Sequence, residues 1–380
     1  THMGNTALSG FGDDKDLMDW LTQDIWPTEG KFMSEEYVQD GAQIGLTELV
    51  KSGTTCVNDM YFIPNATVKA LMKVGVRGLV GAPVFDVPDQ AAGQKMVQDV
   101  SHVITKFREE ALEKRENNRR YDLIGFTIAP HAPYTVSDET FEQCLSTAKE
   151  LNVPIHTHLH ETKHEVEQSI ALNTESSSCH RSKHPISPLE NFHRMGLLDH
   201  HVIAAHMTTI FDGPQWDLVT QYRDNLKIAH CPCSNMKLAS GFCPTHRLTE
   251  ADVHVGLGTD SSGSNNSLDM FAELKWAALI AKGHTYNPKA LPAYHALRMA
   301  TITGARVLGL EKTIGSLEKG KKADIIAVNF GTHLSLPLYD VISHLVYNTT
   351  RDMVDYVWVN GENLMAKRVI YNNLEQEAVE

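Results

Sequence analysis

Short apolar runs that lead to a histidine or an aspartate recur along the chain and constrain its fold more than any other feature of the sequence. The runs lie at residues 54–57, 76–84, 124–129, 153–155, 202–205, 227–229 and 253–258. They lead to Asp59, Asp86, His131, His156 with His158, His206, His230 and Asp260. Helix-like segments lie between them, among them residues 35–52, 66–74, 138–151 and 268–281. Strands that alternate with helices are typical of βαβ units and a parallel sheet.

The spacing of the runs favours a closed barrel. If Thr1 and His2 close a first strand, the eight strand ends up to Asp260 recur about every 37 residues, which suits a (β/α)8 barrel of about 250 residues. An open, doubly wound sheet would show the same alternation. In barrels the catalytic side chains lie at the C-terminal ends of the strands, and hydrophobic burial does not explain histidine and aspartate there. We predict an α/β fold with a TIM-like (β/α)8 barrel and a site at that end.

The sequence changes character after Asp260. Residues 293–310 are predicted to form one helix, because their apolar positions share a face. Residues 314–328 are predicted as a strand, a Gly-Lys turn and a second strand, and residues 356–362 as a strand that runs into an Asn-Gly turn. We therefore predict a barrel domain at residues 1–313 and a small β appendage at residues 314–380.

Composition excludes several classes of protein. The chain carries 34 Lys and Arg against 47 Asp and Glu, a formal net charge of −13, and an acidic surface repels nucleic-acid phosphates. No apolar stretch of about 18 residues predicts a membrane span, and no signal peptide is visible at the N-terminus. Six cysteines are too sparse for a disulfide scaffold. We expect a cytoplasmic protein that binds neither nucleic acid nor membrane.

The segment from His156 to Glu161 carries the strongest chemical signal. On a strand, alternate residues share a face, so His156 and His158 would point together into the barrel mouth, and imidazole is a standard ligand of zinc and iron. Glu161 follows a ligand position by three residues, where a carboxylate can serve as general base. Asp260 ends an apolar strand, where a carboxylate is costly unless it is paired or binds metal.

Two further motifs match known patterns only formally. Residues 160–164 read H-E-x-x-H, but His160 directly follows an apolar strand, whereas the metalloprotease pattern needs both histidines on one helix. Residues 315–321 read G-x-x-x-x-G-K, but Lys322 stands where a phosphate-binding loop needs Ser or Thr. We expect neither a protease nor a nucleotide triphosphate site.

Short motifs along the whole chain point to a known family. They are residues 1–4 (THMG), 12–14 (GDD), 26–29 (WPTE), 129–134 (APHAPY), 158–162 (HLHET), 205–206 (AH), 230–232 (HCP), 234–235 (SN), 258–260 (GTD) and 315–320 (GSLEKG). With these motifs the chain resembles the amidohydrolase superfamily, and within it the chlorohydrolase-like branch that contains the methylthioadenosine/S-adenosylhomocysteine deaminases. The resemblance implies a barrel with a β-sandwich appendage, of which the chain holds the C-terminal half only.

The resemblance also implies a role for each site residue. One divalent metal, usually zinc and alternatively iron, would be bound by His2, His158 and Asp260. Glu161 would be the proton shuttle, His206 would orient or deprotonate the attacking water, and Asp260 would assist proton transfer. The substrate-binding residues would be Glu29 at the ribose, His131 at the purine ring, and Trp26. His160 and His230 are expected at the wall of the site.

The implied reaction is the hydrolytic deamination of a 5′-substituted adenine nucleoside to the inosine analogue and ammonia. One alternative keeps the metal chemistry but takes another aminated heterocycle, such as a guanine-like ring, or a halogenated triazine. Another is a catalytically impaired fragment, because the family has a further histidine two positions before His2. The resemblance therefore implies a chain shortened at its N-terminus. It also favours a homo-oligomer.

Overall fold

The computed structural model describes residues 1–86, 89–171 and 184–371. Its centre is a set of parallel strands that are paired in the orders β1-β2-β4, β3-β5 and β6-β7-β8-β9. Their bounds are Cys56–Met60 (β1), Arg77–Gly81 (β2), Pro83–Val84 (β3), Ile124–Phe126 (β4), Ala129–Pro130 (β5), Ile155–Leu159 (β6), Val202–His206 (β7), Leu226–His230 (β8) and Val255–Leu257 (β9). A parallel bridge from Ile128 to Ile155 joins the two halves of the wall.

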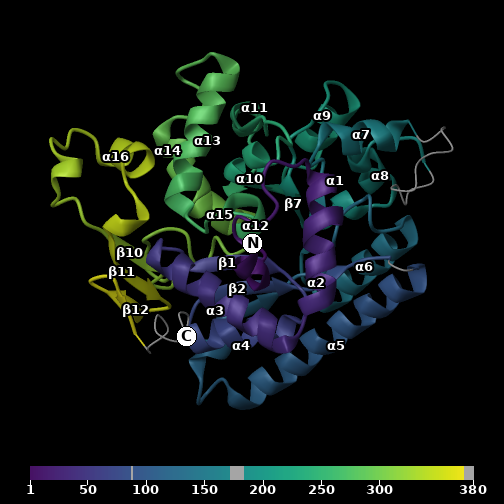
Figure 1. Ribbon diagram of the computed structural model, residues 1–380, viewed down its shortest axis with the longest axis horizontal. Coiled ribbons are helices and arrows are strands. Elements are labelled where there is room, and N and C mark those ends of the chain that lie inside the picture. Colours follow the sequence, from purple (N-terminus) through teal and green to yellow (C-terminus); the bar gives the residue numbers. More distant parts are fainter. Residues whose placement is uncertain (87–88, 172–183, 372–380) are drawn as a thin grey trace.

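Helices surround this wall on the outside, as Figure 1 shows. They are α3 (Glu35–Lys51), α4 (Pro64–Val74), α5 (Gln90–Lys114), α6 (Asp138–Leu151), α7 (Lys163–Ile170), α8 (Pro188–Arg194), α9 (Pro214–Gln221), α10 (Pro232–Lys237), α11 (Thr245–Glu250), α12 (Ser262–Asn265) and α13 (Met270–Thr285). The strands are buried on both faces, as in β6 and β7, where every residue is buried. This is the pattern of a parallel sheet covered by helices.

The N-terminal residues lie where the first strand end was expected. The Thr1 amino group donates to the carbonyl of Asn58 at 2.7 Å, and the Met60 amide donates to the Thr1 carbonyl at 3.0 Å. Thr1 therefore runs beside β1, although no strand is assigned to it. His2 follows directly and is carried to the same end of the wall as the other strand-end residues.

Local signals explain why several helices begin and end where predicted. In α6 the hydroxyl of Ser137 caps the first turn by accepting from the Thr140 amide, and the helix ends at Asn152, which has a left-handed backbone. In α3 the Ser34 hydroxyl accepts from the Tyr37 amide. The predicted helix at residues 138–151 coincides with α6.

The predicted helix at residues 293–310 was wrong as a single element. The chain forms α14 (Ala293–Met299) and α15 (Ile302–Val307), separated at Thr301, whose backbone is not helical (φ −126°, ψ −106°). The break lets α15 lie close against β9. The close approach is seen at Gly256, where a Cβ would lie only 3.0 Å from the Cα of Gly304. A close approach of backbones overrides the helical period here.

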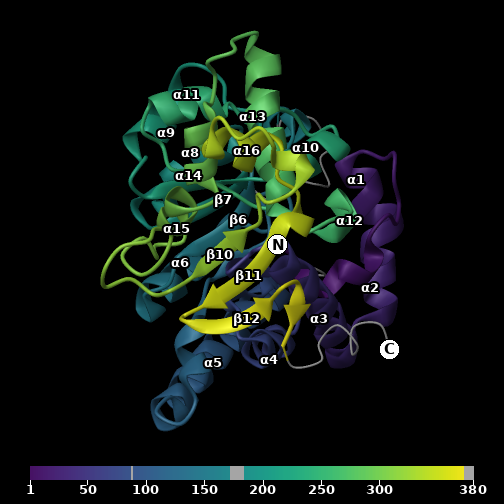
Figure 2. The same ribbon diagram turned by 90° about the vertical axis from the view of Figure 1, so that its left-hand side faces the viewer.

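The C-terminal segment forms one antiparallel sheet in the order β10-β11-β12-β13, which faces the viewer in Figure 2. The strands are Ile325–Val328, Val354–Val359, Glu362–Ala366 and Val369–Ile370. The predicted Asn-Gly turn joins β11 to β12, and both of its residues have positive φ. The strand predicted near residue 314 is absent, since β10 begins only at Ile325 within the described residues.

A second, smaller apolar cluster lies near the N-terminus. The helices α1 (Leu17–Asp19) and α2 (Trp26–Phe32), with the π-helical turn Trp20–Ile25 between them, carry an apolar cluster separate from the main core. It consists of Leu8, Leu17, Trp20, Leu21, Ile25 and Leu238. In the described ranges, no helix has the length and apolar character needed to cross a bilayer.

Candidate active site

The strand ends bring the predicted ligands together. His158 lies on β6, His206 ends β7, and Asp260 follows β9. The backbones of His206 (φ +75°) and Asp260 (φ +60°) are left-handed, a conformation that non-glycine residues adopt at some cost.

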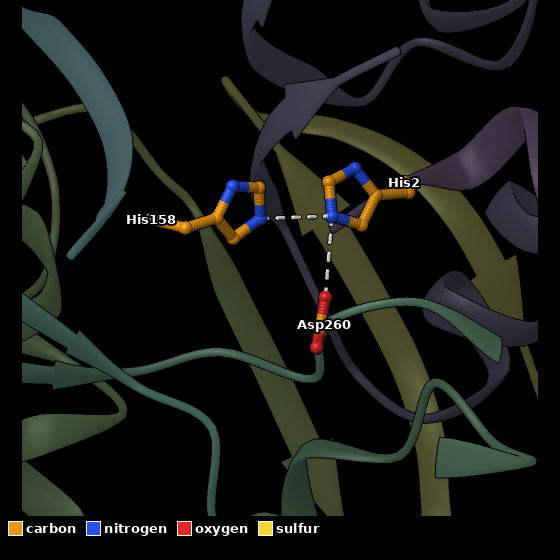
Figure 3. A group of neighbouring side chains, drawn as sticks. All are labelled: His2, His158 and Asp260. Carbon is orange, nitrogen blue, oxygen red and sulfur yellow. Dashed lines mark hydrogen bonds and ion pairs between the residues drawn. The ribbon is translucent and has the colours of Figure 1, made fainter. Parts of the chain in front are cut away.

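His2, His158 and Asp260 form a compact group, and their candidate ligand atoms all lie within 4.8 Å of one another. The two Nε2 atoms of His2 and His158 face each other at 3.4 Å, and Nε2 of His2 lies 3.2 Å from Oδ1 of Asp260. Figure 3 shows both imidazole rings and the carboxylate pointing toward one common space. Among the described residues this is the one cluster with metal-ligand geometry.

The chemistry of these donors fits a divalent cation. Nδ1 of His2 donates to the carbonyl of Met60, and Nδ1 of His158 donates to the carbonyl of His131 at 2.8 Å. A carbonyl can only accept, so each neutral ring carries its proton on Nδ1 and turns an Nε2 lone pair toward the centre. Two lone pairs and a carboxylate oxygen that converge in this way require a positive charge between them.

The pKa values agree with this arrangement. Burial lowers the pKa of His158 to about 3, helped by the nearby His2 and His206, so that His158 stays neutral and able to bind metal. Burial also lowers the pKa of His2, but the hydrogen bond to Asp260, the negative charge of Asp260 and the hydrogen bond to the Met60 carbonyl together outweigh it, and the pKa is raised. Burial raises the pKa of Asp260, but the hydrogen bond from His2 and the charges of His206, His2 and His158 together reverse this, and the pKa lies well below its usual range. When no cation is bound, a proton on His2 supplies the positive charge that faces the carboxylate of Asp260.

The second oxygen of Asp260 is fixed by two hydroxyls. Ser234 donates to Oδ2 at 2.6 Å and Ser264 donates to it at 3.0 Å. Ser234 lies on α10 after β8, and Ser264 lies on α12. Because Oδ2 is occupied by these donors, Oδ1 is the oxygen directed at His2 and the metal position.

A cavity of about 590 Å³, including its open mouth, adjoins the metal ligands. It is lined by His2, Asn5, Leu17, Trp20, Leu21, Ile25, Trp26, Glu29, Met60, Tyr61, Phe62, Pro83, Phe85, His131, Tyr134, His158, Glu161, Leu238, Asp260, Ser261 and Ser264. All the predicted site residues except His206 are in this set. The cavity is therefore mostly apolar on the side of α1 and α2, where Glu29 is the exception, and ionisable at the strand ends.

Glu161 and His206 meet behind the ligands. Nε2 of His206 lies 3.6 Å from Oε1 of Glu161, its Nδ1 donates to the Asn235 side-chain oxygen at 2.8 Å, and its ring stacks on His158. Burial raises the pKa of Glu161, partly opposed by the charge of His206 and by a hydrogen bond from Tyr134. A carboxyl with a raised pKa is suited to giving and taking a proton near neutral pH.

The predicted substrate residues lie in the same cavity. Glu29 is 7% exposed and accepts from the Tyr61 hydroxyl at 2.7 Å, which leaves its second carboxylate oxygen for a ligand. His131 is held by Thr135 at 2.8 Å, and burial together with the nearby His158 keeps its pKa well below the ordinary value. His131 is therefore a neutral ring at the cavity wall.

The remaining strand-end residues have structural roles. Asp59 accepts from the Met3 amide at 2.8 Å, and Asp86 accepts from the Ser137 amide at 2.6 Å. His160 is buried and bonded to the backbone of Thr209 and Leu189, so it lies behind the wall of the described cavity. His230 is also buried outside that cavity. These residues shape the strand ends without lining the cavity.

The protease pattern is not assembled. His160 is buried, whereas His164 is exposed on α7, so the two imidazoles do not share a site. Residues 315–321 open no helix, and the next α-helix in the described chain, α16, spans Val341–Tyr347.

Sequence reasoning missed three residues that hold the predicted ones in place. Tyr61 supports Glu29, Tyr134 supports Glu161, and Asn235 supports His206. Tyr134 and Asn235 lie inside motifs that carried the family resemblance, and this was the available signal. Tyr61 follows β1 directly, two residues after Asp59.

Comparison with known proteins identifies the family. The amidohydrolase family model matches residues 1–364. A protein of Saccharophagus degradans described as 5-methylthioadenosine/S-adenosylhomocysteine deaminase is 40% identical over 97% of this chain and 77% of its own length. A 5′-deoxyadenosine deaminase of Methanosphaera stadtmanae is 34% identical over 100% of this chain and 83% of its own.

A solved structure agrees with these relatives. The crystal structure of an adenosine deaminase from Xanthomonas campestris, with bound zinc, is similar with a TM-score of 0.87 and 36% identity, covering 100% of this chain and 82% of that one. The chain belongs to the amidohydrolase family. It is a hydrolytic enzyme that acts on C–N bonds, and the predicted α/β barrel fold is confirmed.

Proposed function

We propose that this enzyme hydrolytically deaminates a 5′-substituted adenine nucleoside such as methylthioadenosine, S-adenosylhomocysteine or 5′-deoxyadenosine. The observation that carries the proposal is the convergence of two imidazole lone pairs and a carboxylate at one end of a cavity that also presents Glu29 and Glu161. Water replaces the amino group at C6, so that the products are the inosine analogue and ammonia. The names of the relatives favour this substrate class over another heterocycle.

We assign the metal position to His2, His158 and Asp260, and we propose a single zinc ion. A divalent metal in this position supplies Lewis acidity, which lowers the pKa of a bound water toward about 7. The three side chains are oriented for this by Met60, His131 and the two serines described above. Supporting partners of this kind fix the tautomer of a ligand and raise its affinity.

The remaining groups move protons and hold the substrate. His206 takes a proton from the attacking water, and Asp260 assists this transfer. Glu161, whose pKa is raised by burial, gives a proton to ring nitrogen N1 and then receives the proton that His206 took from the water, since the two side chains lie 3.6 Å apart. It passes this proton to the amine, which leaves as ammonia, and takes up the C6 hydroxyl proton, which restores the starting state. Glu29 accepts from the ribose hydroxyls with the oxygen that Tyr61 leaves available. His131 contacts the purine, and Trp26 lines the cavity beside it.

The role of Glu161 can be tested by a substitution that keeps its shape. Glu161→Gln keeps the shape of the side chain but cannot shuttle a proton, so we expect kcat for ammonia release from methylthioadenosine to fall by roughly 10²–10⁴-fold. The metal content of the purified variant, measured by elemental analysis, should equal that of the parent chain. Unchanged turnover would exclude Glu161 as the proton shuttle.

A substrate panel tests the nucleoside assignment separately. Adenosine, 5′-deoxyadenosine, methylthioadenosine and S-adenosylhomocysteine are compared with guanine and a chlorinated triazine, with ammonia or chloride as the readout. Turnover of the triazine alone would contradict the proposal.

A cytoplasmic location and a homo-oligomeric state stay predictions from the sequence. Light scattering of the purified protein tests the oligomeric state.

A further inference from the structure

A buried carboxylate that the proposed reaction does not use holds the backbone of the proposed proton shuttle. Glu165 lies on α7, is 5% exposed, and does not line the described cavity. Its Oε1 accepts from the His160 amide at 3.2 Å, and its Oε2 accepts from the Glu161 amide at 2.7 Å. Both oxygens are thus directed at the turn that follows β6.

The same turn is held from its other side by Thr208. The Thr208 amide donates to the His160 carbonyl at 2.9 Å, and the Thr208 hydroxyl donates to the Glu161 carbonyl at 2.7 Å. His160 has a left-handed backbone (φ +51°), so the turn needs such support to persist. The amides and carbonyls of both residues therefore have fixed partners.

We propose that Glu165 is a positioning residue, which acts by clamping the backbone of Glu161 so that its carboxyl points at the reacting nitrogen. The inference rests on the role proposed for Glu161 above. An isolated side chain on a turn could swing, but a turn whose N–H and C=O groups are all bonded moves little. Displacing a reacting group by about 1 Å can cost about 10²-fold in rate.

An ordinary helix cap is the competing explanation. The Thr162 hydroxyl accepts from the Glu165 amide at 3.1 Å, and the sequence T-x-x-E at the start of a helix is a capping box. The chain offers a matched comparison at α8, where Ser187 and Glu190 form a complete capping box. Glu190 touches no amide of a proposed catalytic residue in the described hydrogen bonds.

The test compares Glu165→Gln with Glu190→Gln. Glutamine presents only one oxygen, so its NH2 group would face one of the two amides and the turn would shift. We expect kcat of the Glu165→Gln enzyme to fall about 10–100-fold with KM within twofold and metal content unchanged, while the Glu190→Gln enzyme keeps kcat within twofold. Both variants should show a similar loss of Tm. An equal kcat in the two variants would overturn the proposal.

Two further variants separate the possible causes. Glu165→Gln in a Glu161→Gln background should cost no additional activity if Glu165 acts through Glu161, and an additive loss contradicts it. If Glu165→Gln does not fold, Thr208→Val decides, because it removes the hydroxyl from the other side of the turn: a severalfold loss of kcat supports the clamp and an unchanged kcat overturns it. Full activity of the Glu161→Gln enzyme would contradict the role of Glu161 in the proposed function, whatever the result for Glu165.

Discussion

A hydrogen bond to one ring nitrogen sets what the other nitrogen of each site histidine can do. His2 and His158 each donate Nδ1 to a backbone carbonyl, and their Nε2 atoms are therefore free to bind metal. His206 differs, since its Nδ1 donates to the side chain of Asn235. A backbone carbonyl cannot be removed by substitution, but an asparagine can.

Asn235→Ala should therefore loosen His206 without touching the metal ligands. We expect kcat to fall roughly 10–100-fold, with KM and metal content little changed, as measured by steady-state kinetics and elemental analysis. Asn191→Ala is the matched control, because Asn191 is also buried and donates to a side chain, that of Asp138. If both variants keep the parent kcat, Asn235 does not orient the proposed base.

Glu273 predicts a pH effect on stability. It is fully buried on α13 and accepts from the Cys233 amide at 3.1 Å and the Asn265 side chain at 2.6 Å. Burial raises its pKa to about 8, so between about pH 4.5 and 8 the folded chain holds a proton that the unfolded chain releases. Its contribution to stability is complete below that range and is lost as the pH rises through about 8.

Glu273→Gln mimics the protonated side chain and should remove this dependence. Between pH 5 and 8, the free energy of unfolding of the parent should fall with pH more steeply than that of the variant, by up to about 1.4 kcal/mol per pH unit. Urea titrations at several pH values measure both slopes. Parallel slopes would mean that Glu273 titrates normally.

Single residues show where sequence reasoning works and where it stops. His158, His206 and Asp260 could be selected because the barrel rule places strand-end side chains at one mouth. The barrel rule does not select Tyr61, Tyr134 or Asn235, because each supports a residue from a different element and such contacts exist only after folding; only the family motifs pointed to Tyr134 and Asn235. For Glu165, the capping-box pattern was visible in the sequence, but the amides that it would bind were not.

At the scale of elements, periodicity predicted α6 well and failed between residues 293 and 310. The apolar face continues across Thr301, but the close approach of Gly256 and Gly304 needs the chain to turn. The chain turns at Thr301 because β9 lies there, and the sequence of residues 293–310 alone does not show this. Likewise, of the two strands predicted within residues 314–328, only the second forms, as β10, and the first finds no partner strand among the described residues.

The link between the C-terminal sheet and the barrel gives a prediction at this scale. The guanidinium of Arg77 on β2 makes two hydrogen bonds to Asp324, at 2.9 and 3.0 Å, and both side chains are buried. Asp324→Ala would leave Arg77 buried and unpaired, which typically costs about 3–5 kcal/mol. We expect a clear fall in Tm in differential scanning calorimetry.

A double variant controls for the lost packing. Arg77→Met combined with Asp324→Leu removes both charges, and it should recover most of the Tm lost by Asp324→Ala. We propose on this basis that residues 314–380 form an appendage to a barrel of residues 1–313, attached through this pair. A single variant as stable as the parent would contradict the attachment.

At the scale of the whole molecule, the metal site should couple to folding. The three ligands come from segments distant in sequence, so the unfolded chain cannot present them together. Saturation with Zn²⁺ at about 100 times its Kd should stabilise the fold by about 2.7 kcal/mol. Thermal scans with Zn²⁺ and with a chelator measure the effect as a rise in Tm.

Asp260→Asn is the control for this prediction. Asparagine keeps an oxygen in place but removes the negative charge, so the rise in Tm on adding Zn²⁺ should be largely lost. The same rise in the variant and the parent would show that the metal stabilises the fold from another place. Scans with His2→Ala extend the comparison to a second ligand.

The left-handed backbones at His160, His206 and Asp260 matter for protein engineering. At each of these positions glycine would relieve backbone strain of about 1–2 kcal/mol. Glycine would also remove side chains that are hydrogen-bonded in the folded chain, and each buried partner left unpaired costs about 1–3 kcal/mol. The strained backbone is therefore retained by the contacts of the very side chains that it places. At positions 206 and 260, an engineer who relieved the strain with glycine would erase proposed catalytic side chains.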